Sequence, residues 1–293
     1  MRSRYYIVAG HAFSISMLAS EDSFALPSYE PFAVDALPEG TSPLFALVID
    51  DSFYPTEKGD SIGDFECGAA DFGVYRLADG AYQMLISPPK GKYCGLLQAN
   101  SDFSQGTIAT RGQDSLRVFA VNNALMLMYA FASATKGTLL VHASVIKNEG
   151  MGYLFLGHSG TGKSTHSSLW LKYIEDSELL NDDNPVIRVD EKKIMVYGSP
   201  WSGKTPCYKN DAACVGAFVR IRQCPENHIV REQPLKAFAT LLPSMSTMKW
   251  DKRVYDGVCD SVGKLVAMTP LYTLDCRPDK EAAELCSKEV KTR

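Results

Sequence analysis

A glycine-rich segment near the middle of the chain constrains its fold more than any other feature. The segment reads Tyr153-Leu-Phe-Leu-Gly157-His-Ser-Gly-Thr-Gly-Lys-Ser-Thr165 and fits the pattern G-x-x-x-x-G-K-[ST]. An apolar run precedes the glycines and a helical pattern follows them, which predicts a strand, a loop and a helix in succession. Glycines in such a loop let backbone N–H groups turn toward a phosphate, and the helix N-terminus adds positive potential. The segment therefore predicts a phosphate-binding loop for a nucleotide.

Individual residues of this loop have distinct expected roles. Lys163 is expected to place a positive charge near the β- and γ-phosphates, and the Ser164 hydroxyl is suited to bind Mg²⁺. His158 occupies a variable position of the pattern and is interpreted as an exposed filler. An ordinary glycine-rich turn between a strand and a helix is the alternative without a ligand. The predicted nucleotide-binding residues are Gly157, Ser159, Gly160, Thr161, Gly162, Lys163, Ser164 and Thr165.

The chain divides into two parts with different sequence patterns. Residues 1–112 form short alternating segments separated by turn signals, which predicts a β-rich domain. The stretch 100–114 is rich in Ser, Gly, Thr and Gln and is interpreted as a linker. Residues 113–293 alternate helix and strand patterns, which predicts an α/β domain and a mixed α+β chain. In that second part we expect helices at 116–134, at 163–174 and from 279, and strands at 138–141, 152–156, 178–181, 186–189, 194–197, 217–221 and 271–275.

Two adjacent acidic residues form the second candidate motif. Asp182 and Asp183 end a predicted strand and lie eight residues beyond the predicted helix end at Ile174, so they can face the loop. Phosphoryl transfer requires a metal, charge stabilisation and a carboxylate that accepts a proton. Two neighbouring carboxylates can divide these tasks, which makes both residues candidate catalytic groups. The alternative is a polar turn over 181–185, because Asn, Asp and Pro all favour turns.

The third candidate is the segment Gly198-Ser-Pro-Trp-Ser-Gly-Lys204, which follows a predicted strand. Lys204 is predicted to offset charge in the transition state, and Trp201 to form a pocket wall for the base or the acceptor. The alternative is a surface turn with a packed tryptophan. Arg220 and Arg222 are interpreted as the exposed charges of an alternating strand.

His142 is the fourth candidate, although nothing local to it indicates a function. The sequence Lys147-Asn-Glu-Gly150 predicts a tight turn, and a hairpin there would return the strand of His142 to the strand that precedes the loop. The imidazole would then approach the γ-phosphate, where a neutral ring can ligate a metal and a protonated ring can contact phosphate. The alternative is a buried histidine that is hydrogen-bonded between strands.

Three of these motifs occur in a recognisable order: Val141-His-Ala-Ser144, the loop Gly157–Thr165, and Leu179-Leu-Asn-Asp-Asp183. Together they resemble the superfamily that HPr kinase/phosphorylase shares with phosphoenolpyruvate carboxykinase. The resemblance covers residues 138–200, and it implies a P-loop domain of the HPr-kinase and carboxykinase type within 113–293. It also implies that Asp183 is the carboxylate directed to a metal and that His142 ligates a second one.

The resemblance implies an ATP-dependent phosphotransferase, a serine kinase of the HPr-kinase type, with Mg²⁺ or alternatively Mn²⁺ as its metal. The acceptor would be a hydroxyl of a Ser or Thr on a protein or peptide, or of a small metabolite. A non-catalytic nucleotide-binding regulatory module is the alternative function. A carboxykinase-like enzyme is a further one, although the chain lacks that family's Asn-Thr-Arg motif.

Composition bounds the partners and the compartment. The formal net charge of −4 argues against a dedicated nucleic-acid binder, which usually carries a basic surface. The eight cysteines include no C-x-x-C pair, so we expect reduced thiols in a cytoplasmic protein. The apolar run 118–134 contains Asn122 and Asn123 and is shorter than a bilayer span of about 20 residues, which predicts a buried helix and no membrane partner. A homo-oligomer is left open.

Overall fold

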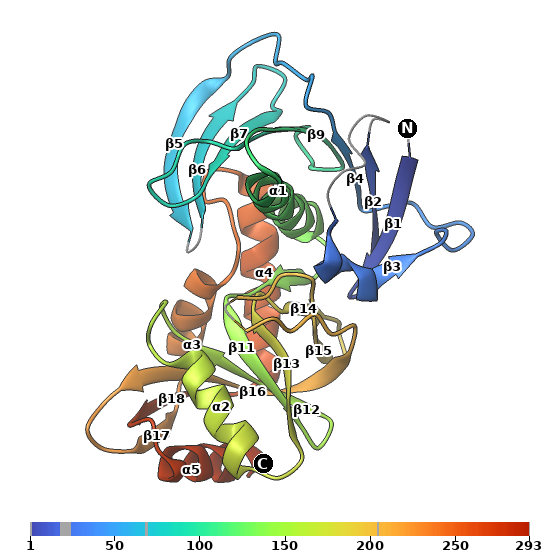
Figure 1. Cartoon of the computed structure of the whole chain (residues 1–293). Helices are drawn as coiled ribbons and strands as arrows, with labels where there is room; N and C mark the ends of the chain where they lie inside the picture. The colour runs from blue at the N-terminus through green and yellow to red at the C-terminus, as the bar shows by residue number, and fades with distance from the viewer. Residues whose placement is uncertain (1, 18–24, 68–69, 204, 293) are drawn as a thin grey trace. The chain divides into compact units, whose positions relative to one another are not determined.

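The computed structural model describes residues 2–17, 25–67, 70–203 and 205–292. The chain is mixed α+β and divides into two compact units, Met1–Ala132 and Ser133–Arg293 (Figure 1). Each unit contains a large sheet with both parallel and antiparallel strands. Every candidate residue named above, from His142 onward, belongs to the second unit.

The first unit is built on a nine-stranded sheet with the order β3-β1-β2-β4-β9-β8-β7-β6-β5 in its described part. Strand β4 pairs in parallel with β2 and with β9, and the other pairs are antiparallel. Residues 1–112 are thus rich in strands, as expected. The strands are β1 (Arg2–Val8), β2 (His11–Met17), β3 (Ala33–Val34), β4 (Phe45–Ile49), β5 (Asp60–Cys67), β6 (Ala70–Arg76), β7 (Tyr82–Ser87), β8 (Gly95–Ala99) and β9 (Gln105–Thr110).

The predicted linker over 100–114 is wrong. Strand β9 occupies its centre and pairs with β4 on one side and β8 on the other. The Ser and Asn residues before it form a tight turn in which Asn100 Nδ2 donates to Ser104 Oγ. Polar turn residues next to a short strand therefore resembled a linker in composition.

Helix α1 (Asp114–Ser133) packs within the first unit rather than the second. The Tyr129 hydroxyl donates to the carbonyl of Val8 at 2.9 Å, and the Phe131 ring lies 5.1 Å from that of Phe103. The division falls at Ala132/Ser133, so the expected boundary at 112/113 lies too early by the length of this helix. Its apolar residues are used to cover the first sheet.

Helix α1 is also the only helix in the described residues that is long and apolar enough to cross a membrane. More than half of its most hydrophobic window, 56%, is buried inside the protein. That burial agrees with the buried helix that the sequence predicted, although the helix, at 20 residues, is longer than the apolar run on which the prediction was based.

The second unit contains another nine-stranded sheet in its described part, ordered β10-β14-β15-β16-β12-β11-β13, with β18 and β17 continuing from β16. The long strand β16 pairs in parallel with β12 along one edge. Its other edge pairs first with β15 and then with β18. The strands are β10 (Thr138–Leu140), β11 (Ala143–Asn148), β12 (Met151–Leu156), β13 (Ser177–Asp183), β14 (Val186–Val189), β15 (Ile194–Tyr197), β16 (Ala212–Gln223), β17 (His228–Arg231) and β18 (Leu271–Cys276).

The register of three strands places the candidate motifs at the same end of neighbouring strands in this sheet. A two-residue turn at Glu149 and Gly150, both with positive φ, closes the β11–β12 hairpin. The hairpin predicted from the sequence is thus present. Ala143 pairs with Leu156 on one side and with Asp183 on the other. Three features consequently meet at this end of the strands: His142, the start of the glycine loop and the acidic pair.

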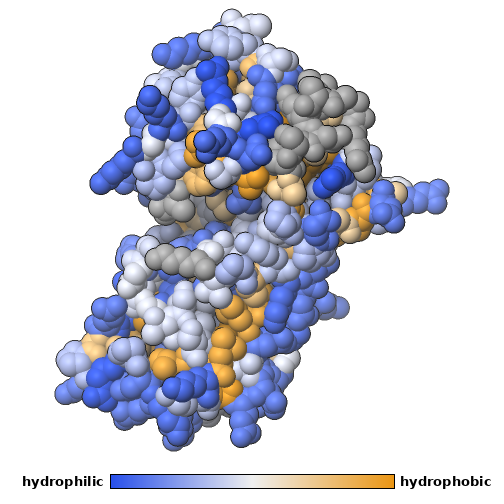
Figure 2. Space-filling view, in the orientation of Figure 1, coloured by the Kyte–Doolittle hydropathy of each residue, from blue (hydrophilic) through white to orange (hydrophobic). Residues whose placement is uncertain are grey.

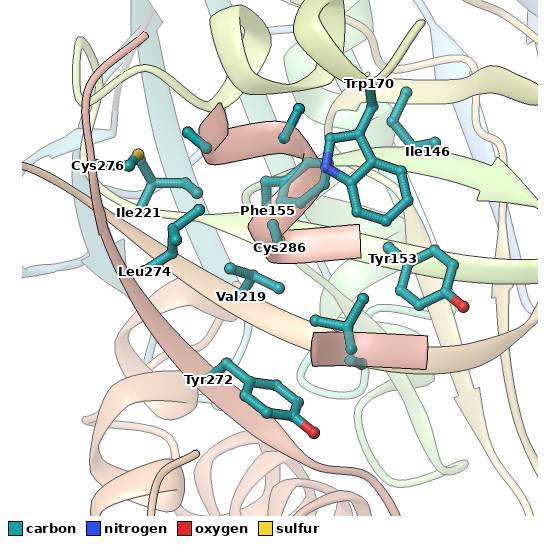
Figure 3. Packing of buried hydrophobic residues seen from close by; sticks show 14 residues of the cluster. Ile146, Tyr153, Phe155, Trp170, Val219, Ile221, Tyr272, Leu274, Cys276 and Cys286 are labelled. Atoms are coloured by element: carbon teal, nitrogen blue, oxygen red, sulfur yellow. The ribbon is translucent and has the colours of Figure 1, made fainter. Parts of the chain in front are cut away.

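Four helices of more than one turn accompany this sheet in the described part of the second unit: α2 (Lys163–Tyr173), α3 (Pro234–Leu241), α4 (Lys252–Met268) and α5 (Lys280–Lys291). Helices α2 and α5 share one apolar core with strands β12, β16 and β18 (Figure 3). The fully buried Trp170 of α2 lies in it, with its ring centroid 5.1 Å from Tyr153 and 5.6 Å from Phe155. This packing fixes α2, and with it the residues at its N-terminus.

The outer surface is largely hydrophilic in the face shown in Figure 2, with apolar residues in smaller patches. Large apolar side chains that are exposed among the described residues include Leu235 and Val230 of the second unit. Most apolar side chains are therefore buried in the two sheets and their helices.

Candidate phosphate-binding site

The glycine loop connects the end of β12 to the start of α2. Gly157 and Gly162 have φ of 150° and 105°, values that residues with a side chain rarely adopt. A Cβ atom at Gly157 would lie only 2.4 Å from Thr161 Oγ1. Thr161 in turn closes the loop, because its amide and its hydroxyl both donate to the carbonyl of His158. The first and last glycines are therefore required by backbone geometry.

Lys163 is the first residue of α2, and its side chain turns back across the loop. Its Nζ donates to the carbonyl oxygens of Gly157 at 2.9 Å and His158 at 3.3 Å. The residue is only 8% exposed. Burial lowers the pKa of the Lys163 ammonium, while the negative charges of Asp183 and Asp182 oppose that shift. The lysine is thus a buried cation in the loop, and no carboxylate among the described residues contacts it directly.

His142 connects this lysine to the second aspartate. Its Nε2 lies 2.9 Å from Lys163 Nζ, and its Nδ1 lies 3.0 Å from Asp183 Oδ1. An ammonium can only donate, so Nε2 accepts and the ring proton sits on Nδ1, where it is donated to Asp183. The side chains of His142 and Asp183 are 39% and 33% exposed. The histidine is therefore neither in the core nor isolated.

Ser164 and Asp182 form the second connection in the site. The Ser164 hydroxyl donates to Asp182 Oδ1 at 2.9 Å, and Asp182 is buried, with 4% exposure. One turn further along α2, the hydroxyls of Ser167 and Ser144 lie 2.6 Å apart and join the helix to β11. These contacts hold the start of α2 against the two strands that carry His142 and the acidic pair.

Asp183 has an unusual backbone, with φ of 141°, and Asn184 Nδ2 donates to its Oδ2 at 2.9 Å. A regular strand would send adjacent side chains to opposite faces. The distorted backbone at the end of β13 instead lets both Asp182 and Asp183 reach the loop region. Conformations of this kind in residues other than glycine cost free energy and persist where the surroundings hold them.

The segment from Gly198 to Gly203 packs directly beneath the acidic pair. The Ser202 hydroxyl donates to the carbonyl of Asp182, and a Cβ at Gly203 would lie 3.1 Å from Asp183 Cβ. Trp201 is almost fully buried, which favours the packed tryptophan over an exposed pocket wall. Lys204 lies outside the described residues, so its predicted catalytic role stays a prediction.

A hollow of about 410 Å³ lies on the β16 side of the loop. Loop residues 157–161 line one wall, and the end of β16, from Arg220 to Gln223, lines the other. Gln223 Nε2 donates to the carbonyl of Gly160 at 3.3 Å and so connects the strand to the loop. This wall was not predicted from the sequence, because the alternation of β16 indicated only a charged outer face.

The donors at this site fit a magnesium ion that is bound together with a nucleotide. The described residues contain no group of three or more His, Cys, Asp or Glu that could hold a metal by themselves. Mg²⁺ normally needs only one or two protein oxygens, because waters and phosphate oxygens complete its octahedron. Ser164 Oγ and Asp182 Oδ1, which are hydrogen-bonded to each other, provide such a pair.

The structure thus brings together Lys163, Ser164, His142, Asp182 and Asp183. The exposed residues Ser159, Gly160 and Thr165 remain open to a ligand at the loop and the start of α2. No protein-family model matches the chain, and no curated protein sequence does either. This geometry and the resemblance of the motifs are therefore what indicate a function.

Proposed function

We propose that this chain is an ATP- and Mg²⁺-dependent phosphotransferase that transfers the γ-phosphoryl group to a hydroxyl. The observation that carries the proposal is the connected set Ser164–Asp182 and Lys163–His142–Asp183 at the mouth of a glycine loop. A loop that served only as a turn would have no need for a buried lysine and two carboxylates around it. A domain of the HPr-kinase and carboxykinase type and a cytoplasmic location belong to the same proposal.

The phosphate chain would be held by the loop and by Lys163. Backbone N–H groups of the loop donate to phosphate oxygens, and the start of α2 adds positive potential. When nucleotide enters, the Lys163 ammonium exchanges its bonds to the Gly157 and His158 carbonyls for bonds to phosphate. Because the group is already desolvated, its charge is screened little and acts strongly on a phosphate.

Different carboxylates serve the metal and the acceptor in this proposal. Asp182 is buried and bonded to the Ser164 hydroxyl, so these two residues would hold Mg²⁺. The bound metal would neutralise charge on the β- and γ-phosphates. Asp183 is exposed enough for an acceptor hydroxyl to reach, and His142 fixes its orientation. Asp183 would then accept the proton of the attacking hydroxyl.

This division differs from the one that the resemblance implied, where Asp183 was directed to the metal. The hydrogen bond between Ser164 and Asp182 supports the change. His142 and Asp183 still offer two ligands for a second metal ion, since imidazole nitrogen and carboxylate oxygen both ligate divalent ions.

The decisive experiment is phosphoryl transfer from γ-labelled ATP in the presence of a cell lysate, used dialysed and undialysed. Label in protein indicates a Ser or Thr acceptor, and label in small molecules that requires the undialysed lysate indicates a metabolite. Lys163→Ala should abolish transfer, with a loss of about 3 kcal/mol or more in transition-state stabilisation.

Lys172→Ala is the matched control, because Lys172 lies exposed in the last turn of the same helix. It should leave transfer unchanged. ATP binding by the wild-type chain without transfer to any acceptor would contradict the proposal and favour the non-catalytic regulatory module.

A further inference from the structure

The hollow beside the glycine loop contains an arginine that the proposed reaction has not used. Arg220 and Arg222 both line it, but their surroundings differ. Arg222 Nε and Nη2 donate to the two carboxylate oxygens of Asp275, each at 2.6 Å. In the described part of the chain, the Arg220 guanidinium has no hydrogen-bond or ion-pair partner, and Asp275 senses its charge only at longer range.

The register of β16 places Arg220 at the mouth of the loop. Arg220 pairs with Leu156, the last residue before Gly157. The strand then continues along the loop, and the Ile221 carbonyl would lie 3.4 Å from a Cβ at Gly157. Ala217, Val219 and Ile221 point into the core shared with α2 and α5. Arg220 therefore points to the opposite face, and at the end of β16 it lines the hollow together with Ile221, Arg222 and Gln223.

An arginine in this position is suited to an anion. It is half-buried, so part of its hydration is already lost without a carboxylate to replace it. Its planar guanidinium matches phosphate oxygens in geometry and gives strong, charge-assisted hydrogen bonds. The neighbouring Arg222 is neutralised by Asp275, which leaves Arg220 as the cation available to a ligand in the hollow.

We propose that Arg220 recognises the phosphate chain of the nucleotide bound in the loop, from the side opposite to the reacting groups. This inference rests on the proposed nucleotide site. His142, Asp182 and Asp183 lie on the β11–β13 side of β12, whereas β16 lies on its other side. When the β- and γ-phosphates face Lys163 and Asp182, the α-phosphate extends toward β16. An acceptor hydroxyl, by contrast, needs to reach Asp183 on the far side.

The test is equilibrium binding by titration calorimetry with Mg²⁺ and without an acceptor. The probes are a non-hydrolysable ATP analogue and inorganic triphosphate, which lacks the nucleoside. Arg220→Gln should weaken both probes by about tenfold or more, because a charged hydrogen bond is lost. Arg220→Lys keeps the charge and should lose less. Arg231→Gln is the control, because this exposed arginine on β17 lies in the same sheet but outside the hollow; it should bind both probes as wild type does.

Several outcomes would overturn the inference. If Arg220→Gln binds both probes as tightly as the wild type does but transfers less phosphate in the lysate assay, Arg220 acts at the acceptor instead. Weaker binding of the ATP analogue alone would place it at the nucleoside. If the wild-type chain binds neither probe, the nucleotide site fails and this inference fails with it. If the wild type binds and Arg220→Gln does not, the inference holds even where no transfer is found, and only the proposed activity fails.

Discussion

Asp182 and Asp183 are adjacent in the sequence, yet they bond to different groups. The buried Asp182 accepts from Ser164, and the more exposed Asp183 bonds to His142. Sequence reasoning correctly expected the two residues to lie beside the loop, since a strand that follows the loop helix ends at the same edge. It could not assign their roles, because these depend on the unusual backbone at Asp183, for which the sequence gives no local signal.

The two carboxylates should be separable by their effect on metal dependence. Asp182→Asn should raise the Mg²⁺ concentration needed for half-maximal rate, because an amide oxygen is a weaker ligand than a carboxylate. Asp183→Asn should lower the rate at every Mg²⁺ concentration, because an amide does not accept the acceptor's proton. The measurement is the initial rate against Mg²⁺ at saturating ATP. The reverse pattern would restore Asp183 as the metal-directed residue.

His142 should affect the reaction more than the stability of the fold. His142→Gln roughly keeps the size of the side chain but disrupts the contacts to Lys163 and Asp183. We expect a fall in rate of about a hundredfold, typical of a lost proton-transfer or orienting group, with little change in melting temperature because the side chain is partly exposed. His228→Gln, which changes an exposed histidine on β17 outside the hollow, is the control and should react at the wild-type rate. A large fall in melting temperature at normal specific activity would instead show that His142 only supports the fold.

At the scale of elements, the sequence predicted those that carry local signals. The hairpin β14–β15 has the predicted bounds, and the helix expected from residue 279 is α5, which is capped by Asp279. Strand β9 was missed because its flanks are rich in turn residues. Helices α3 and α4 were missed, although α4 carries a local signal, since the Asp251 side chain caps its N-terminus. Strand β17 was also missed, because it is only four residues long. Such strands form because they pair with strands that are distant in the sequence, and a single sequence does not reveal that pairing.

The cap of α5 should contribute measurably to stability. Asp279 accepts a hydrogen bond from the Ala282 amide at 3.0 Å, and the helix contributes Cys286 and Val290 to the main core of the second unit. Asp279→Ala should lower the free energy of unfolding by about 1 kcal/mol, whereas Asp279→Asn, which can still accept that bond but lacks the charge, should lose a smaller part of it. Urea unfolding at pH 7 measures both. Equal losses in the two variants would indicate that the charge matters rather than the cap.

The same residue gives a pH dependence of defined sign. The bond from the Ala282 amide lowers the pKa of the Asp279 carboxyl in the folded protein below its ordinary value of 3.8. The unfolded chain therefore takes up this proton first as the pH falls. The part of the stabilising contribution that depends on the charge is present above pH 4 or so and is lost as the pH falls through the folded-state pKa. The free energy difference between wild type and Asp279→Ala should shrink below about pH 4, and a difference that stays constant with pH would contradict this origin.

At the scale of the whole molecule, the boundary between the units is the point where sequence and structure differ most. Composition changes near residue 112, but the contacts change at Ala132. Helix α1 is apolar around most of its surface, so its pattern gave no indication of which sheet it covers. Its assignment came from specific contacts such as that between Tyr129 and Val8, which connect residues far apart in the chain.

Two fragments should distinguish the boundaries. All described residues of the candidate site, from His142 to Gln223, lie in the second unit, so residues 133–293 should be soluble and folded and should bind ATP as the whole chain does. Residues 113–293 would also carry α1, whose Val121, Leu125 and Met128 are fully buried in the whole protein. Without the first sheet these side chains would be exposed, and we expect that fragment to aggregate in size-exclusion chromatography. A folded 113–293 beside an unfolded 133–293 would instead show that α1 belongs to the second unit.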